Sequence, residues 1–187
     1  NARRLLQHLI GFLRNSLQHA RAEQCTLAQE FAMLRAYLDI QALRFGQRLQ
    51  FSLALDDAIA NIVIPPMLIQ PLVENAVVHG IEPAREGGEI ALSARREGER
   101  LVLEVRDTGV GMSPEQIEKA SEGMASFEAA YSRHQDGAGL GLPLTYLLIE
   151  RQGGRIEIES RKGTESTTTV RLIFPKDCVT GAKGDFI

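Results

Sequence analysis

The spacing of apolar residues changes once along this chain, and the change restricts the folds that the sequence can adopt. Up to residue 45, apolar side chains recur every three or four positions, which predicts two helices, over residues 3–20 and 27–45. From residue 49 onward, apolar side chains alternate with polar or small ones, as in a half-buried strand: Leu49, Phe51, Leu53 and Leu55. The sequence therefore predicts a helical hairpin followed by a domain that contains a β-sheet.

The elements predicted after residue 55 follow one another in an order that is typical of an α+β fold. They are a helix (65–80), two strands (89–96 and 101–106), two helices (one from 114, one over 140–152) and two strands (155–160 and 167–174). The short turn at residues 97–99 predicts that the first two of these strands form an antiparallel hairpin. We expect a two-layer α/β sandwich, in which a mixed sheet is covered on one face by helices and preceded by the helical hairpin.

Capping patterns mark the starts of two helices. Thr26 with Gln29 three residues later is a capping-box pattern at the start of the helix over 27–45. Ser113, directly before Pro114, is the expected cap of the helix that starts at 114. Residues 121–136 show no clear period, and we expect a mobile segment there with room for one helical turn.

A chain of 187 residues is long enough for one ordinary domain and a smaller helical piece. We expect a helical region over residues 1–46, the α+β domain over 47–175 and a loose tail over 176–187. The apolar stripe of the helical hairpin suits a dimeric four-helix bundle. Packing of that stripe on the domain that follows is an equal alternative.

Composition excludes several classes of function. A net charge of -3 without a basic cluster gives no sign of nucleic-acid binding. Cys25 and Cys178 are far apart and in no metal-binding spacing, which indicates a reducing compartment or an incidental pair. No apolar run is long enough to span a membrane, so we expect no membrane contact by this segment. The chain starts within a helical pattern and without a methionine, which predicts a fragment of a longer protein.

The predicted helix over residues 65–80 is mostly apolar but carries three polar side chains. Asn75 and His79 are four residues apart, so they share one line of an α-helix, with Glu74 beside them. Prolines near the start and Gly80 at the end are the expected helix boundaries. The residues alone leave two interpretations open, ordinary helix positions or a binding site.

A carboxylate follows the buried face of the predicted strand over residues 101–106. Asp107 continues the alternation of its inward-facing residues, Leu101, Leu103 and Val105. A buried carboxylate needs hydrogen-bond donors, and the amino group of adenine is a suitable one. Gly109 and Gly111 would let the backbone approach a flat ring closely. The alternative is an ordinary turn at the end of a strand.

A second glycine cluster, residues 137–142, runs directly into a predicted helix. Glycine-rich backbone that opens a helix presents free N–H groups and the positive end of the helix dipole, an arrangement that binds phosphate. Bound nucleotide phosphates need a Mg²⁺ ion, which prefers oxygen ligands. The side-chain amide of Asn75 offers such an oxygen.

Together and in this order, these motifs resemble the ATP-binding domain shared by sensor histidine kinases, type II topoisomerases, Hsp90 and mismatch-repair ATPases. More narrowly, the chain is similar to the LytS/YehU-type histidine kinases over residues 1–175. The matching residues are Leu27-Ala28-Gln29-Glu30, Tyr37-Leu38-Asp39-Ile40-Gln41, Arg44-Phe45, Ile64-Pro65-Pro66, Gln70-Pro71-Leu72-Val73-Glu74-Asn75-Ala76 and His79-Gly80.

The resemblance implies a role for each matching residue of the nucleotide site. Asn75 would bind the Mg²⁺ that bridges the ATP phosphates, and Asp107 would accept a hydrogen bond from adenine N6. Glu74 would orient a metal-bound water, and His79 would lie near the nucleotide. The base pocket and the phosphate loop, under a lid formed by 121–136, would use Gly109, Gly111, Met112, Gly137, Gly139, Leu140, Gly141 and Leu142.

The chain departs from the family at two places. The family often has lysine where this chain has Val78, and Arg133 or His134 would have to supply the missing positive contact. The family's phosphorylated histidine lies in an Asn-Pro-His-Phe-Leu-Phe-Asn stretch that this chain lacks, so the acceptor is expected upstream of Asn1. His8 and His19 match later helical positions and are interpreted as ordinary helix residues.

The resemblance therefore implies the catalytic segment and part of the dimerisation region, residues 1–46, of a two-component sensor histidine kinase. Its expected partners are ATP, a response regulator and a second copy of the chain, and its expected location is the cytoplasmic side of a membrane-anchored sensor. Two alternatives remain: a degenerate module that only binds nucleotide, and an ATPase clamp of the Hsp90 or mismatch-repair type. The clamps place a glutamate base where this chain has Pro71, which argues against the second.

Overall fold

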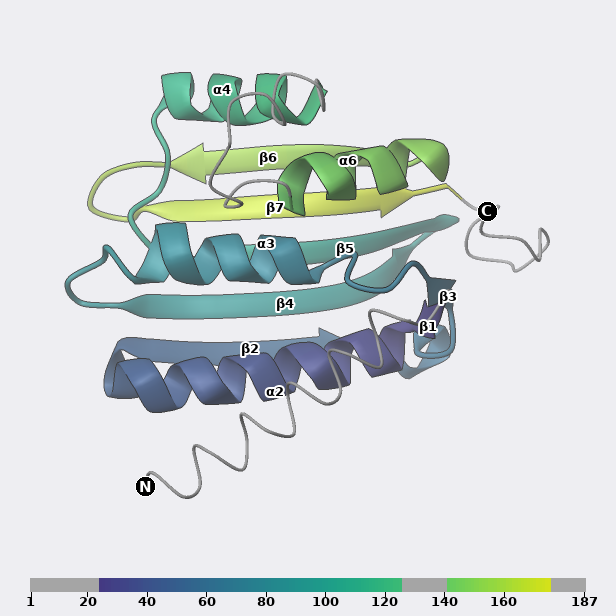
Figure 1. The fold of residues 1–187 in the computed structure, drawn as a ribbon, viewed down its shortest axis with the longest axis horizontal. Coiled ribbons are helices and arrows are strands. Elements are labelled where there is room, and N and C mark those ends of the chain that lie inside the picture. Colours follow the sequence, from purple (N-terminus) through teal and green to yellow (C-terminus); the bar gives the residue numbers. More distant parts are fainter. Residues whose placement is uncertain (1–23, 126–140, 176–187) are drawn as a thin grey trace.

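The computed structural model describes residues 24–125 and 141–175. A five-stranded sheet forms one layer, in the strand order β2-β4-β5-β7-β6 (Figure 1). The pair β2–β4 is parallel and the other three pairs are antiparallel, so the sheet is mixed as predicted. The strands are β2 (Leu49–Leu55), β4 (Gly88–Glu97), β5 (Arg100–Asp107), β6 (Arg155–Arg161) and β7 (Thr167–Phe174).

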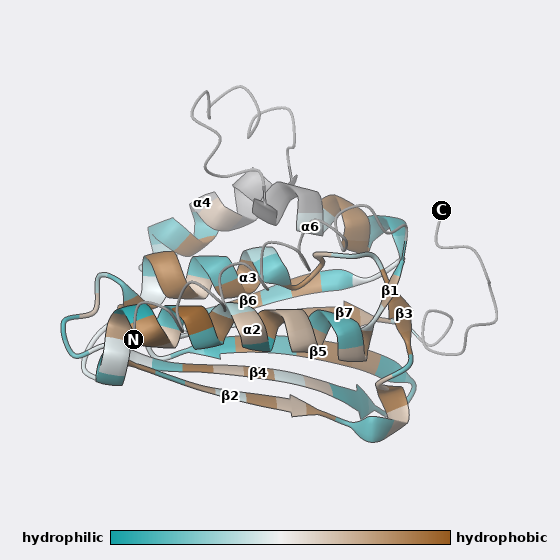
Figure 2. Cartoon of the chain, turned by 60° about the horizontal axis from the view of Figure 1, so that its bottom comes forward, coloured by the Kyte–Doolittle hydropathy of each residue, from teal (hydrophilic) through white to brown (hydrophobic). Residues whose placement is uncertain are grey.

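Helices form the second layer. Figure 2 shows α2, α3 and α6 over one face of the sheet, which confirms the predicted α+β sandwich. The first helix of the predicted hairpin, over 3–20, lies outside the described residues. The helices are α2 (Leu27–Phe45), α3 (Gln70–Asn75), the π-helical turn η3 (Ala76–Ile81), α4 (Pro114–Ala125) and α6 (Gly141–Arg151).

Helix α2 belongs to the core of this domain. Its start has the predicted capping box, because the Thr26 hydroxyl accepts from the Gln29 amide and the Gln29 side chain accepts from the Thr26 amide. Leu27, Leu34 and Leu38 are completely buried in the core that the helices share with the sheet. The part of the apolar stripe that lies on α2 therefore packs on the domain that follows, and the part on the first helix lies outside the described residues.

A short ladder that the sequence does not predict ties α2 to the segment before α3. β1 (Cys25–Thr26) pairs with β3 (Val63–Ile64), so residues far apart in the chain are held together at the start of α2. Two 3₁₀ turns, η1 (Gly46–Arg48) and η2 (Asp57–Ile59), flank β2.

The structure corrects two predicted boundaries. The helix predicted over 65–80 begins only at Gln70, because Pro66 disfavours helical geometry at Pro65 and Met67 has a left-handed backbone, with φ 59°. Gly80 lies inside the π-helical turn and does not end an α-helix. Helix α4 begins at Pro114 with Ser113 as its cap, as predicted, but it extends to Ala125, so residues 121–125 are helical.

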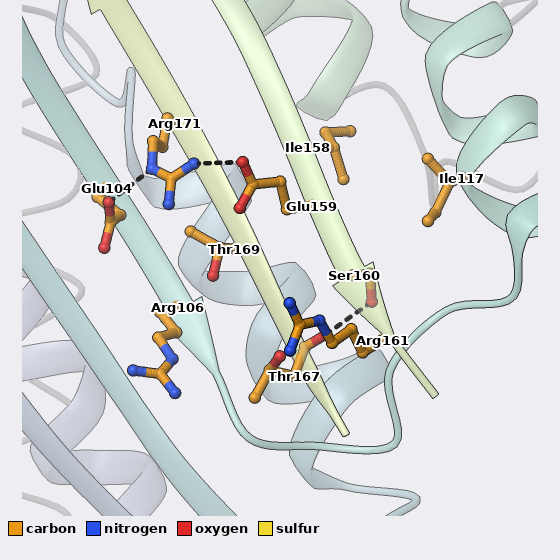
Figure 3. A pocket seen from close by; sticks show the side chains of 10 residues that line it. All are labelled: Glu104, Arg106, Ile117, Ile158, Glu159, Ser160, Arg161, Thr167, Thr169 and Arg171. Atoms are coloured by element: carbon orange, nitrogen blue, oxygen red, sulfur yellow. Dashed lines mark hydrogen bonds and ion pairs between the residues drawn. The ribbon is translucent and has the colours of Figure 1, made fainter. Parts of the chain in front are cut away.

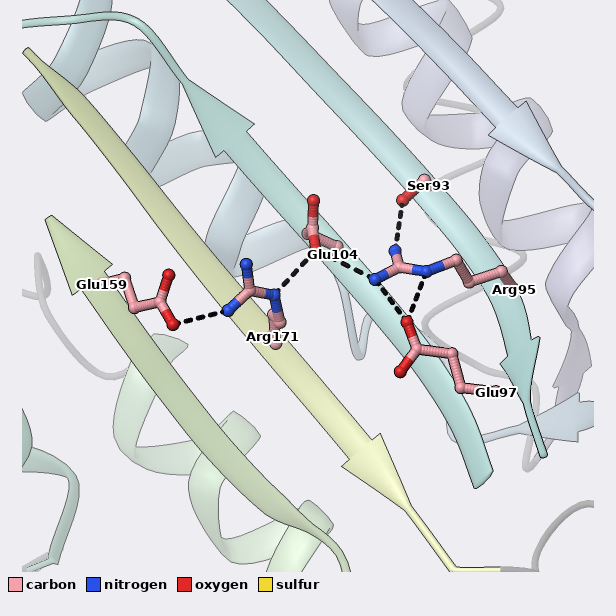
Figure 4. Close-up of polar contacts among 6 residues, drawn as sticks. All are labelled: Ser93, Arg95, Glu97, Glu104, Glu159 and Arg171. Atoms are coloured by element: carbon pink, nitrogen blue, oxygen red, sulfur yellow. Dashed lines mark hydrogen bonds and ion pairs between the residues drawn. The ribbon is translucent and has the colours of Figure 1, made fainter. Parts of the chain in front are cut away.

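The two faces of the sheet differ in character. The inner face carries the buried side chains that the alternation predicts in β5, Leu101, Leu103 and Val105. The outer face carries ion pairs between strands (Figure 4): the Arg171 guanidinium lies 2.8 Å from carboxylate oxygens of both Glu104 and Glu159. Exposed pairs of this kind stabilise a protein by about 1 kcal/mol at most, so the inner face dominates stability.

Truncation of a buried side chain in α2 tests whether this helix is part of the domain. We expect Leu34→Ala to lower the free energy of unfolding by about 2–5 kcal/mol, since the side chain is completely buried. The exposed neighbour Arg35 is the control, and Arg35→Ala should change the value by less than about 0.5 kcal/mol. Chemical denaturation of the 187-residue chain measures both. An unchanged main transition in Leu34→Ala would mean that α2 unfolds separately from the sheet.

Candidate functional site

Asp107 ends the central strand β5 on the buried face of the sheet. It lies between Ile90 of β4 and Thr168 of β7, and its exposed fraction is 5%. Burial raises the pKa of this carboxyl from 3.8 to about 6, although a hydrogen bond from the Gly109 amide to Oδ1, at 3.0 Å, favours the charged form. This bond ends on Oδ1. Among the described residues no donor binds Oδ2, so that oxygen is available for another donor.

Two glycines lie against this carboxylate. A Cβ atom at Gly80 would lie 2.5 Å from Asp107 Oδ1, and one at Gly109 would lie 2.2 Å from the Gly80 carbonyl carbon. The Val110 amide also donates to the Gly80 carbonyl at 3.2 Å. Two stretches of backbone therefore meet beside Asp107 in a space that admits no side chain at either glycine.

The π-helical turn η3 makes this approach possible. Its wider ring is seen in the hydrogen bond from the Glu82 amide to the Val77 carbonyl, five residues earlier, at 2.9 Å. The turn places Gly80 against Asp107, whereas His79 is exposed. Sequence reasoning assumed an α-helical period throughout and so paired Asn75 with His79, and it missed Gly80 as a site residue.

Asn75 and Glu74 lie on different sides of α3. Asn75 is the last residue of α3 and is half-buried. Glu74 accepts a hydrogen bond from Gln70 Nε2 at 2.7 Å. The pKa of Tyr37 in α2 is raised to about 12, mainly by burial and next by the negative charge of Glu74. The Glu74 carboxylate is therefore close enough to α2 to affect Tyr37, and its predicted role toward a metal-bound water stays a prediction.

The loop after Asp107 is fixed at both of its ends. Thr108 accepts a hydrogen bond from the Glu89 amide at 2.8 Å, and the Met112 amide donates to Ser160 Oγ at 2.9 Å. Gly111 has φ 66°, and a Cβ atom there would lie 2.0 Å from the Arg161 carbonyl oxygen. The glycines of the predicted base pocket are thus required by close backbone approach.

The second glycine cluster does open a helix, because α6 starts at Gly141. Gly137, Gly139 and Leu140 lie outside the described residues. Farther along α6, the buried Thr145 hydroxyl donates to the Leu68 carbonyl at 3.4 Å. This contact places α6 against the loop that leads into α3, and so brings the two predicted phosphate-binding elements together.

A cavity of about 570 Å³ lies elsewhere, on the outer face of the sheet (Figure 3). Outward-facing residues such as Glu104, Arg106 and Thr169 line it, so the sheet separates it from Asp107. The two buried side-chain oxygens that lack a partner in the described ranges, on Gln41 and Gln70, are not part of its lining. We assign it no role.

The described residues lack two kinds of feature. They contain no group of three or more His, Cys, Asp or Glu side chains able to hold a metal ion. None of their helices is long and apolar enough to cross a bilayer.

Comparison with known proteins agrees with the geometry. A profile described as "Histidine kinase-, DNA gyrase B-, and HSP90-like ATPase" matches residues 65–177, which is more than half of the chain. A profile described as "Histidine kinase" matches residues 1–49.

Curated relatives are sensor kinases that are much longer than this chain. Sensor histidine kinase YpdA of Escherichia coli K12 is 39% identical over 118 residues, which is 63% of this chain and 21% of the relative. Sensor histidine kinase/phosphatase LytS of Staphylococcus aureus MRSA252 is 30% identical over 175 residues, 93% of this chain and 29% of the relative. The chain thus spans less than a third of the length of these relatives.

Solved structures share the fold. The catalytic domain of histidine kinase ThkA has a TM-score of 0.57 at 20% identity, covering 82% of this chain and 94% of that one. Full-length ShkA in complex with AMPPNP has a TM-score of 0.56 at 23% identity, covering 90% of this chain and 36% of that one. The predicted resemblance is therefore confirmed: this chain belongs to the histidine kinase-, DNA gyrase B- and HSP90-like ATPase family, and its relatives are sensor histidine kinases of the LytS type.

Proposed function

We propose that this chain is the ATP-binding catalytic part of a two-component sensor histidine kinase. It transfers the γ-phosphoryl group of ATP to a histidine upstream of residue 1, from which the group passes to an aspartate of a response regulator. The observation that carries the proposal is the Asp107 carboxylate, buried beside two glycines with Oδ2 available to a donor.

Adenine fits the chemistry around Asp107. Its exocyclic amino group can donate to Oδ2 of Asp107, and the close packing of Gly80 and Gly109 against this carboxylate holds it in place. A guanine base presents a carbonyl oxygen at the same position, and two acceptors would then face each other. The geometry therefore favours ATP over GTP.

The phosphates would lie between α3 and the start of α6. The first backbone N–H groups of α6 have no partner within the helix, and the helix dipole favours negative charge there. The Asn75 amide oxygen has the chemistry of a Mg²⁺ ligand, and Mg²⁺ usually takes only one or two protein ligands when phosphates supply others. Bound Mg²⁺ neutralises charge on the phosphates, while the chain positions the nucleotide.

An ATPase clamp is disfavoured by the position one helical turn before Asn75. That position is Pro71, in the first turn of α3, and proline cannot act as a base. Dimer formation, membrane anchoring of the longer protein and a location on the cytoplasmic side of the membrane are parts of the same proposal.

Substitution of the proposed adenine-binding carboxylate should weaken nucleotide binding. We expect Asp107→Asn to lower ATP affinity about 10- to 100-fold, because a neutral amide with a single acceptor oxygen replaces the charged acceptor in a buried site. Isothermal calorimetry on the 187-residue chain measures the affinity. The neighbour Arg106 is exposed on the other face of β5, so Arg106→Gln should bind ATP as the parent does. Micromolar ATP affinity in Asp107→Asn would contradict the assignment.

The same substitution should make the nucleotide-free protein more stable at neutral pH. Because the pKa of Asp107 is about 6 in the folded state and 3.8 otherwise, the folded state binds more protons between these values. The free energy of unfolding therefore falls as pH rises through this window, by up to about 3 kcal/mol. Denaturation curves should show Asp107→Asn more stable than the parent at pH 7 and equal to it below about pH 4. If the parent and Asp107→Asn were equally stable at both pH values, burial of the Asp107 charge would have no energetic cost.

Phosphoryl transfer requires the longer protein. With the upstream segment present and γ-labelled ATP added, we expect acid-labile phosphate on histidine, and none in Asp107→Asn. Nucleotide binding without label transfer would favour the degenerate module, and rapid phosphate release without an acceptor would favour the clamp.

A further inference from the structure

The Glu30 carboxylate of α2 is completely buried and binds the loop that precedes α3. Its Oε2 accepts from the Met67 amide and its Oε1 from the Ile69 amide, each at 3.1 Å. These residues lie 37 and 39 positions along the chain, so the contact is entirely tertiary. One carboxylate thus fixes two alternate amides of a single loop.

The loop needs such an acceptor to hold its shape. Pro65 and Pro66 have no N–H group, and neither has Pro71 in the first turn of α3, so little of the loop can form backbone hydrogen bonds of its own. Met67 has φ 59°, a left-handed conformation that a residue with a side chain adopts only when its surroundings enforce it. The two bonds to Glu30 lie on either side of Leu68, which is itself completely buried.

The opposite side of the loop is held by α6. The Thr145 hydroxyl donates to the Leu68 carbonyl, the residue between the two that Glu30 binds. Ile69 then leads directly into α3, because its carbonyl accepts from the amides of Leu72 and Val73. Three consecutive loop residues therefore connect α2 and α6 to the first turn of the helix that carries Asn75.

We propose that Glu30 is a positioning residue of the nucleotide site: through the amides of Met67 and Ile69 it sets the place of α3 and hence of the Asn75 amide oxygen. The inference rests on the proposed function, because it concerns the same Mg²⁺–ATP site. It also links the two profile matches, since α2 lies in residues 1–49 and α3 in residues 65–177.

Glu30→Gln tests the proposal with little change of shape. The amide oxygen can accept from one loop N–H, but the amide nitrogen is a donor and cannot accept from the other. In the proposed site Asn75 binds Mg²⁺ and Asp107 binds adenine. Loss of the Glu30 carboxylate should therefore weaken the Mg²⁺-dependent part of ATP binding and leave the binding of adenine intact. The gain in ATP affinity on adding Mg²⁺ should shrink about 10- to 100-fold, while ATP affinity in EDTA stays unchanged.

Two further variants separate positioning from stability. Leu34→Ala removes a buried side chain of the same helix but no hydrogen bond to the loop, so it should lower stability and keep the Mg²⁺-dependent gain. Glu30→Asp retains two acceptor oxygens on a shorter stem and should recover part of the gain that Glu30→Gln loses.

Amide hydrogen exchange gives a readout that needs no nucleotide. The Met67 and Ile69 amides should exchange faster in Glu30→Gln than in Leu34→Ala, although both variants are folded. A folded Glu30→Gln protein with an undiminished Mg²⁺-dependent gain would overturn the proposal, as would an equal loss of gain in Leu34→Ala. If the proposed function itself is wrong, the parent protein will show no Mg²⁺-dependent gain in ATP affinity. That result differs from a failure of the positioning role alone, in which the parent protein and Glu30→Gln show the same gain.

Discussion

Two buried carboxylates organise this domain, and they solve the same physical problem differently. A carboxylate removed from water needs donors, or its charged form becomes costly. Glu30 receives two backbone amides from one loop, so the protein itself meets the need. Asp107 receives one, from Gly109, and burial raises its pKa to about 6. In the proposed function, the adenine amino group supplies the further donor for Asp107, whereas the protein itself supplies the donors for Glu30 and so holds the loop before α3 in place.

The binding site also depends on backbone that comes unusually close. Gly80 reaches Asp107 because the hydrogen bonds of η3 span five residues, one more than in an α-helix. Gly109 then lies against Gly80. Such π-helical turns are rare and occur frequently at functional sites. A regular α-helix would turn a different residue toward the carboxylate. The local irregularity of η3 thus determines which residue lies against Asp107.

Sequence predicted the parts of this structure that depend on local chemistry. Alternation placed Asp107 on the inner face of β5, and the capping box at Thr26 marked the start of α2. The role of Glu30 was invisible, because its bonds join residues 37 and 39 positions apart. Gly80 was missed for another reason: helical periodicity assumes a constant number of residues per turn, and η3 departs from it. Tertiary contacts, rather than propensity, determine these features.

The polar residues of α3 fit transfer of phosphate to a side chain better than transfer to water. Glu74 precedes Asn75 by one residue, which turns it about 100° around the helix. There it accepts a hydrogen bond from Gln70, and its charge helps to raise the pKa of Tyr37 in α2. Pro71 fills the position one turn before Asn75, so α3 itself offers no carboxylate base on the Asn75 side. Under the proposed function, a site without such a base would leave water poorly activated and would preserve the phosphoryl group of ATP for an incoming histidine.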